Sequence, residues 1–179
     1  IMNYKLLKLL LSSIFTAAII WLLSTSLGPL PPLGSFFYPT QGFWQNAETG
    51  LPAGAYKTEI PAVKDSVDVY YDQRGVPHIF ALNDNDLYTA QGFVTARHRL
   101  WQMDIQARSA AGRLAEVVGK EALPHDRYKR RIGMLYGAEQ AVESMRRDSV
   151  VWNAVQAYTN GINAYIEQLE PEEYPLEYK

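Results

Sequence analysis

The sequence predicts an α+β fold in which a short β-hairpin precedes a mainly helical region. Two successive patterns of apolar residues along the 179-residue chain indicate this. In "VDVYYDQRGVPHIFA" apolar and polar residues alternate, which is typical of short strands around a turn. Beyond "LNDNDL" the apolar residues recur every three or four positions, which is typical of helices. An apolar segment at the N-terminus stands apart from both patterns.

Composition limits the kinds of function that fit the chain. With 47% hydrophobic residues, it can bury a core of about one modest domain. The net charge is −2, and only two of the 17 basic residues precede Glu48, whereas all 19 acidic residues lie from there onward. No basic surplus is available to attract nucleic acid, so we predict no nucleic-acid partner. The absence of cysteine excludes disulfides, thiolate metal sites and a Cys nucleophile in this sequence.

The first 27 residues are predicted to be a signal peptide or a membrane anchor. Lys5 and Lys8 precede the apolar run from Leu9 to Leu23, and this order is typical of an export signal. Extended to Leu6 and Leu27, the run is long enough to span a bilayer. The flanking lysines argue against a buried core helix. Because no Ala-x-Ala cleavage site follows, the anchor is favoured, with the lysines in the cytoplasm and the remainder exported to the periplasm.

Residues 28–60 are predicted to form a linker rich in proline and aromatic residues. Prolines in "GPLPPLG" predict an extended spacer from Gly28 to Gly34. An aromatic run follows, and it lies either against the folded domain or at the membrane interface. Both interpretations stay open for Phe36, Phe37, Tyr38, Phe43 and Trp44.

The hairpin prediction rests on alternation and turn chemistry. One side of the first strand is expected to carry Val67, Val69 and Tyr71, with Asp68, Tyr70 and Asp72 on the other. Gly75 supplies the turn, and Pro77 confines the second strand to an edge or a strand start. The candidates for the next helix N-cap are Asn83, Asp84 and Asn85.

Three helices are predicted from apolar stripes. The first stripe consists of Phe93, Ala96, Leu100, Met103, Ala107, Ala110, Leu114 and Val117, and we expect Leu100 and Met103 to be buried. Gly92 and Gly112 are candidate bends, and Gly119 is a candidate helix end. The second stripe consists of Tyr128, Ile132, Leu135, Val142 and Met145. The third helix is capped by Asp148 and ended by Pro171, with a stripe of Val151, Val155, Tyr158, Ile162, Tyr165 and Leu169.

Charged residues and histidines show no complete catalytic or metal-binding pattern. Arg97 and Arg108 lie off the first stripe, and the spacings Asp104–Arg108 and Arg113–Glu116 predict helix-surface ion pairs rather than a phosphate site. "RYKRR", from Arg127 to Arg131, is expected to be a solvated helix start. His78, His98 and His125 lack metal-ligand spacing and are expected to be structural. No serine lies in a known nucleophile motif, so we assign no catalytic, cofactor-binding or metal-ligating residue in this chain.

The order of these segments closely resembles the start of the α-subunit in the penicillin acylase (penicillin amidase) family, which are N-terminal-nucleophile hydrolases. The "D-x-x-G-V-P-H-I-x-A" pattern is matched at Asp72, Gly75, Val76, Pro77, His78, Ile79 and Ala81. The "D-L-x-x-A-x-G-F/Y-x-x-A" pattern is matched at Asp86, Leu87, Ala90, Gly92, Phe93 and Ala96. The patterns "R-L-x-Q-M" and "R-x-x-x-G-x-L-A-E-x-x-G" are matched at Arg99, Leu100, Gln102, Met103, Arg108, Gly112, Leu114, Ala115, Glu116 and Gly119.

The resemblance covers about Val67 to Lys179 and includes "GINAYIEQ" and "YPLEYK". One departure is His98, where the family usually has Asp; this is expected to change a local ion pair. The resemblance implies that residues 61–179 are the N-terminal part of an α-chain and contribute to a four-layer αββα fold.

The resemblance also implies an exported precursor that cuts itself into α and β chains and hydrolyses the amide bond of a small N-acyl substrate. The nucleophile would be the first residue of the β-chain, with its own α-amino group as base. Calcium is implied only for the full-length protein, with ligands outside this sequence. The resulting hypothesis is a fragment that is inactive alone. A non-catalytic, membrane-tethered helical interaction module is the rival hypothesis.

Overall fold

The computed structural model describes residues 4–26, 32–34, 36–38 and 57–178. The chain divides into two units, one comprising residues 1–55 with 170–179 and the other residues 56–169. In the described part of the first unit, helix α1 covers Tyr4–Ser24, and two 3-10 turns, η2 and η3, cover Pro171–Glu173 and Leu176–Tyr178. Most of the spacer predicted from Gly28 to Gly34, together with Phe43 and Trp44, lies outside the described residues.

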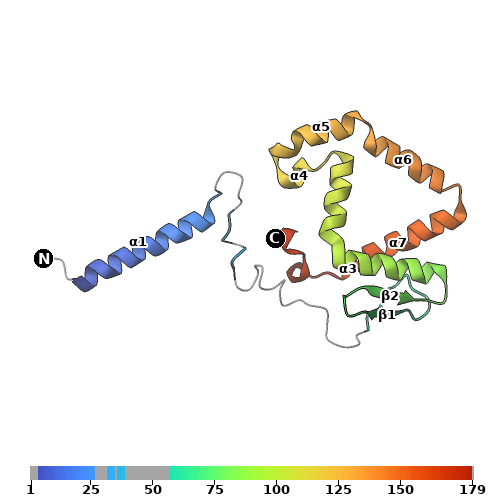
Figure 1. Cartoon of the computed structure of the whole chain (residues 1–179), viewed down its shortest axis with the longest axis horizontal. Coiled ribbons are helices and arrows are strands. Elements are labelled where there is room, and N and C mark those ends of the chain that lie inside the picture. Colours follow the sequence, from blue (N-terminus) through green and yellow to red (C-terminus); the bar gives the residue numbers. More distant parts are fainter. Residues whose placement is uncertain (1–3, 27–31, 35, 39–56, 179) are drawn as a thin grey trace. The chain divides into compact units, whose positions relative to one another are not determined.

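The second unit is α+β, as the sequence predicts, with a two-stranded sheet followed by helices (Figure 1). Strands β1 and β2 cover Asp68–Tyr71 and Pro77–Phe80. The helical elements are α3 (Asp84–Ala111), α4 (Ala115–Val118), η1 (Lys120–Ala122), α5 (Leu123–Arg131), α6 (Met134–Met145) and α7 (Ser149–Gln168).

The β-hairpin has the predicted strands and turn. β1 and β2 pair antiparallel, with Val69 opposite Ile79, and these two side chains are half-buried while Asp68 and Phe80 are exposed. Gly75 adopts a φ of 75°, which glycine reaches without steric cost. The predictions of alternating faces and of Pro77 at a strand start are confirmed.

The core of the second unit lies where α3 and α7 cross. Its buried apolar residues are Ala90, Phe93, Val94, Ala96, Ala157 and Ala164. A glycine from each helix allows the backbones to touch: a Cβ on Gly161 would overlap the carbonyl oxygen of Thr89, and one on Gly92 would overlap that of Tyr158. The ring of Phe93 meets that of Tyr165 edge to face at 5.4 Å between centroids. Only glycine permits this close crossing.

Helix α3 bends, but not at the glycines that the sequence suggested. The non-helical residue is Arg99, with φ −140° and ψ 20°, and Figure 1 shows the two arms of α3 pointing in different directions. Gly92 lies in the regular first arm, where it serves the crossing with α7. Gly112 ends the helix in the left-handed conformation, and Gly119 ends the short α4 instead.

The bend also makes the burial predicted for the first apolar stripe wrong. Phe93 and Ala96, before the bend, are buried. Leu100 and Met103, expected in the core, are only half-buried, and Ala107, Ala110 and Val117 are exposed. The reason is that α7 covers the first arm of α3, whereas the second arm leaves that contact.

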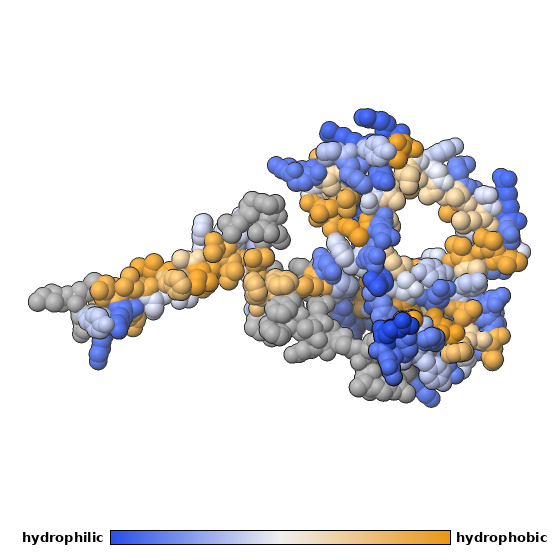
Figure 2. Space-filling model, viewed as in Figure 1, coloured by the Kyte–Doolittle hydropathy of each residue, from blue (hydrophilic) through white to orange (hydrophobic). Residues whose placement is uncertain are grey.

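The second predicted helix is two helices. Gly133 adopts a left-handed φ of 71° and separates α5 from α6, which lacks a buried residue. "RYKRR" therefore closes α5, with Lys129, Arg130 and Arg131 in its last turn, and is not the helix start that we predicted. Figure 2 shows an opening through this unit between α3, α5, α6 and α7, with hydrophobic side chains at several points of its rim.

Replacement of Gly161 by alanine tests the crossing. The added methyl group would meet the Thr89 carbonyl and lie 2.8 Å from the Phe93 nitrogen, so the helices must separate. We expect a loss of about 1–3 kcal/mol in the free energy of unfolding, measured by urea denaturation. The matched control is Gly137→Ala in α6, where a Cβ meets nothing within 4 Å. This control should gain up to about 1 kcal/mol, because alanine favours a helix over glycine. Equal effects of the two substitutions would contradict the role of Gly161.

Candidate functional site

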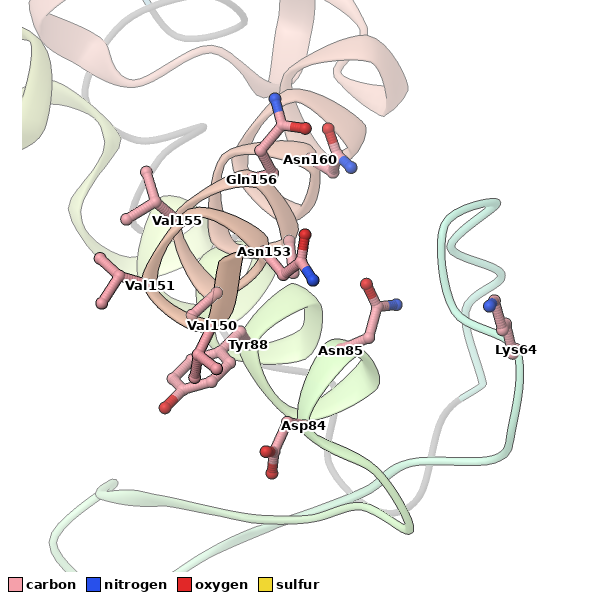
Figure 3. Close-up of a pocket in the computed structure, with 12 residues that line it drawn as sticks. Lys64, Asp84, Asn85, Tyr88, Val150, Val151, Asn153, Val155, Gln156 and Asn160 are labelled. Atoms are coloured by element: carbon pink, nitrogen blue, oxygen red, sulfur yellow. The ribbon is translucent and has the colours of Figure 1, made fainter. Parts of the chain in front are cut away.

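A groove lies between the first turns of α3 and the N-terminal half of α7. Its volume is about 790 Å³, and α3 contributes Asp84, Asn85 and Tyr88. Figure 3 shows three valines and three amide side chains of α7 pointing to different sides of that helix. These residues are Val150, Val151, Val155, Asn153, Gln156 and Asn160. Lys64 stands opposite Asn85, on the segment before the hairpin (Figure 3).

The groove offers hydrogen-bonding groups but no arrangement for bond cleavage. Of its charged residues, Asp84 belongs to the first turn of α3, and Lys64 is exposed. No hydroxyl among its lining residues is paired with a histidine or carboxylate base in the part of the chain that the structure describes. A hydroxyl nucleophile needs a base or another group that activates it. The groove can therefore contact a polar surface, but it does not form a catalytic site.

Asp86 is fully buried beside the groove and binds backbone amides from a distant segment. Its two carboxylate oxygens accept hydrogen bonds from the N–H groups of Lys64, at 3.0 Å, and Asp65, at 2.9 Å. The amide side chains of Asn83 and Asn85 also donate to it. Four donors satisfy this charge, so Asp86 fastens residues 64–65 to the start of α3.

The same hydrogen bonds set the charge state of Asp86. The amides of Lys64 and Asp65 stabilise the ionised form and lower its pKa from 3.8 to about 2. Asn83 also caps α3, accepting a hydrogen bond from the Asp86 N–H at 2.9 Å, which confirms one of the three predicted N-cap candidates. The chain before Lys64 is held as well, because the side-chain amide of Gln168 donates to the Glu59 carbonyl at 2.7 Å.

A second buried carboxylate has the same role at the other end of α3. Asp126 accepts hydrogen bonds from the N–H groups of Leu114 and Ala115, at 2.9 and 2.8 Å, which lie at the start of α4. Next to it, the Arg130 guanidinium donates to the Gly112 carbonyl at 2.8 Å. One residue from the first turn of α5 and one from its last turn thus hold the chain where α3 ends.

The arginines of the long helix form the predicted ion pairs. Arg108 pairs with Asp104 at 2.9 Å and Arg113 with Glu116 at 2.8 Å, and both predictions are confirmed. Arg108 also reaches Glu116 at 3.0 Å, which joins the two pairs into one network. The hydrogen bond from Arg113 lowers the pKa of Glu116. With carboxylates on both arginines, this network is no phosphate site.

The three histidines lie apart and contact different elements. His78 of β2 lies 3.9 Å from the Asp72 carboxylate. His98 contacts the Tyr71 hydroxyl at 3.1 Å, joining β1 to α3 one residue before the bend. Burial, reinforced by the charges of Arg97 and Arg99, lowers the pKa of His98. In this contact the hydrogen-bond partner of His98 is the phenol of Tyr71.

His125 makes the contact that most resembles a nucleophile–base pair. Its Nε2 lies 2.9 Å from the Ser109 hydroxyl and 3.3 Å from the Ser109 carbonyl. The adjacent carboxylate of Asp126 is occupied by the amides of Leu114 and Ala115. A Ser–His pair needs a third group that orients the histidine and donors that bind the oxyanion. The geometry instead fastens α5 to the end of α3.

The described part of the chain contains no cluster of side chains that could bind a metal ion. There, no three His, Asp or Glu side chains converge to hold a cation. The residues present thus do not fit the calcium ion that the resemblance implies for a full-length protein. Every buried side-chain nitrogen or oxygen in the described ranges has a hydrogen-bond partner.

The family model for penicillin amidase matches residues 66–179. The chain belongs to the penicillin amidase family. It is 36% identical over 131 residues to the penicillin acylase 2 proenzyme of Pseudomonas sp. (strain SE83), which covers 73% of this chain and 16% of that protein. It is 31% identical over 116 residues to the acyl-homoserine lactone acylase QuiP of Pseudomonas aeruginosa, covering 65% of this chain and 14% of that protein.

A solved structure shares the fold of the family segment. The thermostable penicillin G acylase from Alcaligenes faecalis matches with a TM-score of 0.56 and 33% identity, over 63% of this chain and 60% of that one. The chain spans only 16% and 14% of the length of the two curated relatives. Both buried aspartates and both crossing glycines lie within the matched family segment.

For this penicillin amidase family member, sequence reasoning missed the two buried aspartates as positioning residues. Asp86 had one available signal, since a carboxylate three residues after an Asn N-cap lies where helix N-terminal amides favour negative charge. Its partners at Lys64 and Asp65 come from a segment whose position the sequence pattern does not specify. Asp126 had no comparable signal, because its amide partners lie 11 and 12 residues away.

Asp86→Asn tests the carboxylate anchor through the pH dependence of stability. The folded-state pKa of Asp86, about 2, lies below its ordinary value of 3.8, so ionised Asp86 stabilises the fold above about pH 4. That contribution is lost as pH falls towards 2. We expect Asp86→Asn to lower the melting temperature by several degrees at pH 7, with a difference from the wild type that shrinks between pH 4 and pH 2. A difference that stays constant over this range would show that Asp86 acts through packing alone.

Ser109→Ala tests whether the Ser109–His125 contact is catalytic. We expect turnover per active site of the full-length enzyme to be unchanged, because the pair lacks an orienting group and oxyanion donors. The melting temperature should fall slightly, since about 1 kcal/mol of hydrogen bonding is removed. A loss of turnover by orders of magnitude, without a loss of folded protein, would place the nucleophile at Ser109.

Proposed function

We propose that this chain is the N-terminal part of an exported penicillin-acylase-family amidohydrolase. The full enzyme hydrolyses the amide bond of a small N-acyl substrate. Family membership over residues 66–179 is the observation that supports this most directly. The printed names of the relatives describe acylases, and one of them is called a proenzyme. This chain corresponds to a small share of their length.

The nucleophile is proposed to be the N-terminal residue of a second chain cut from the same precursor. Its hydroxyl attacks the amide carbonyl, and its own α-amino group, with a pKa near 8, accepts the proton. Amide donors of the second chain stabilise the tetrahedral oxyanion. The described residues of this chain support this assignment because Ser109–His125, their one histidine–serine contact, lacks the groups that catalysis requires.

The proposed role of residues 61–179 is to form a wall of the four-layer αββα fold. Helix α6 supports this role because it is amphipathic and has no buried residue. Its apolar residues Leu135, Val142 and Met145 are exposed, although apolar helix faces in soluble proteins normally pack against another element. We propose that the second chain of the precursor covers them.

For the acyl group of the substrate we propose two classes. The named relatives act on penicillins and on acyl-homoserine lactones, so a β-lactam side chain and an N-acyl-homoserine lactone are the two leading candidates. The groove between α3 and α7 provides amides, valines and one lysine but no catalytic pair. We propose that the acyl pocket is built from other parts of the precursor.

Export is proposed to depend on helix α1. An 18-residue window within its 21 residues has a mean hydropathy of 2.2, and Lys5 and Lys8 lie near its N-terminal end. A basic flank before an apolar helix directs the following domain across the membrane. The family domain would then face the periplasm.

The function is tested with the full-length precursor. Purified protein should contain two chains and release amine from chromogenic N-acyl amides, with a panel of phenylacetyl and fatty-acyl substrates defining the acyl preference. Residues 57–178 alone should show no turnover. A precursor that stays uncut and inactive would support the rival hypothesis of a non-catalytic interaction module.

Leu135→Ser tests whether α6 meets a partner in the mature enzyme. Burying a leucine stabilises a protein by about 1.5–3 kcal/mol, so the substitution should lower the yield of processed enzyme and its melting temperature. Turnover per titrated active site should remain near normal. Exposed Glu139 on the same helix provides the matched control, and Glu139→Ser should change neither quantity. An unchanged yield for Leu135→Ser would show that α6 stays exposed.

A further inference from the structure

We propose that α1 is kept in the mature protein as a single-span anchor in a phospholipid bilayer. Its outer end is completed by an aromatic collar, defined here as Trp21, Phe36, Phe37 and Tyr38, which lies among the lipid headgroups. The inference rests on the proposed export of the chain. It goes further, because a signal peptide removed after export would leave no anchor.

The dimensions of α1 fit a bilayer. Its 21 residues give a length of about 31 Å, close to the ~30 Å thickness of a hydrocarbon core once the aliphatic stems of Lys5 and Lys8 are counted within it. None of its residues is buried, and beyond its first two turns it is apolar apart from Ser12, Ser13, Thr16 and Ser24. Lys5 and Lys8 occupy those turns, from which their long side chains reach the headgroups.

Two hydroxyl groups of α1 donate hydrogen bonds within the helix. Ser12 donates to the Leu9 carbonyl at 3.2 Å, and Thr16 donates to the Ser12 carbonyl at 2.9 Å. At the outer end, Thr25 donates to the Trp21 carbonyl at 3.1 Å. A hydroxyl without a partner is costly in hydrocarbon, where water is absent. The internal hydrogen bonds of Ser12 and Thr16 therefore lower the cost of placing these two residues in hydrocarbon.

The chain beyond α1 folds back onto the outer end of the helix. The Leu23 carbonyl is among the last four of α1, which have no partner inside the helix. It accepts a hydrogen bond from the Gly34 N–H at 2.8 Å. A Cβ at position 34 would lie 3.2 Å from that oxygen, so the approach favours glycine. This contact joins α1 to residues that would follow a signal cleavage site, and cleavage near Ser26 would destroy it.

The fold-back places aromatic rings at the level of the helix end. The Phe37 N–H donates to the Leu33 carbonyl at 3.2 Å, and the rings of Phe36 and Phe37 meet edge to face at 5.2 Å. All four collar residues are exposed, whereas in water such rings would normally be covered. Aromatic side chains concentrate at membrane interfaces, where one part of the ring is in apolar and another in polar surroundings. Of the two interpretations of this aromatic run, the proposal takes the interface for its described members.

The anchor is tested with the full-length precursor expressed in a Gram-negative host with a C-terminal tag. We expect mass spectrometry of the mature α-chain to recover peptides of α1, and the enzyme to stay in the membrane pellet after an alkaline carbonate wash. Ser24→Ala combined with Ser26→Ala creates an Ala-Thr-Ala sequence and provides the reference for a cleaved, soluble enzyme with unchanged turnover. A wild-type chain that begins beyond Ser26 and is soluble in the periplasm would overturn the anchor while leaving export intact.

Protease added to spheroplasts separates the two proposals. Digestion of the family domain shows that it has crossed the membrane, whereas full protection would overturn both export and the anchor. In lipid nanodiscs, lipids brominated near the headgroup should quench a part of the tryptophan fluorescence that disappears in Trp21→Phe. Equal quenching in the wild type and Trp21→Phe would overturn the collar. Phe36→Ser with Phe37→Ser should move Trp21 away from the headgroup level and reduce that quenching, and unchanged quenching would also count against it.

Discussion

The close crossing of α3 and α7 is the constraint on which the folded unit depends. Gly92 and Gly161 bring the two backbones into contact, and the buried side chains around them are small, apart from Phe93. A core built from alanines has little apolar area per residue, so its stability depends on close packing over the whole contact. The same crossing fixes the spacing between the two helices and so creates the groove beside Asp84 and Asn85.

The parts of the structure that the sequence predicted are those governed by neighbours along the chain. The Asn83 and Asp148 caps, the turn at Gly75 and the Asp104–Arg108 pair each involve residues within four positions of one another. The predictions that were wrong depend on tertiary contacts. Leu100 and Met103 follow the helical period, but the bend at Arg99 directs them away from α7, and a periodic stripe carries no signal for such a bend.

The two buried aspartates hold backbone segments in place and do not form a reactive site. Asp86 and Asp126 each use both carboxylate oxygens to hold two consecutive backbone amides. Because these donors occupy its oxygens, such a carboxylate is not free to contact a substrate. The two aspartates fix the chain at opposite ends of α3, and a rigid α3 is what a wall of a larger catalytic domain requires.

The burial of side chains in this unit decreases from the contact between α3 and α7 towards α6. Burial is concentrated where α7 covers the first arm of α3, it decreases past Arg99, and it is absent in α6. Local opening needs less free energy where few apolar contacts are buried, so α6 is the element least stabilised by the described residues. The sequence nevertheless gives α6 one apolar face, because Leu135, Val142 and Met145 recur at helical spacing. The partner chain that we propose would supply the burial that α6 lacks, and the close crossing of α3 and α7 holds the unit from which α6 extends.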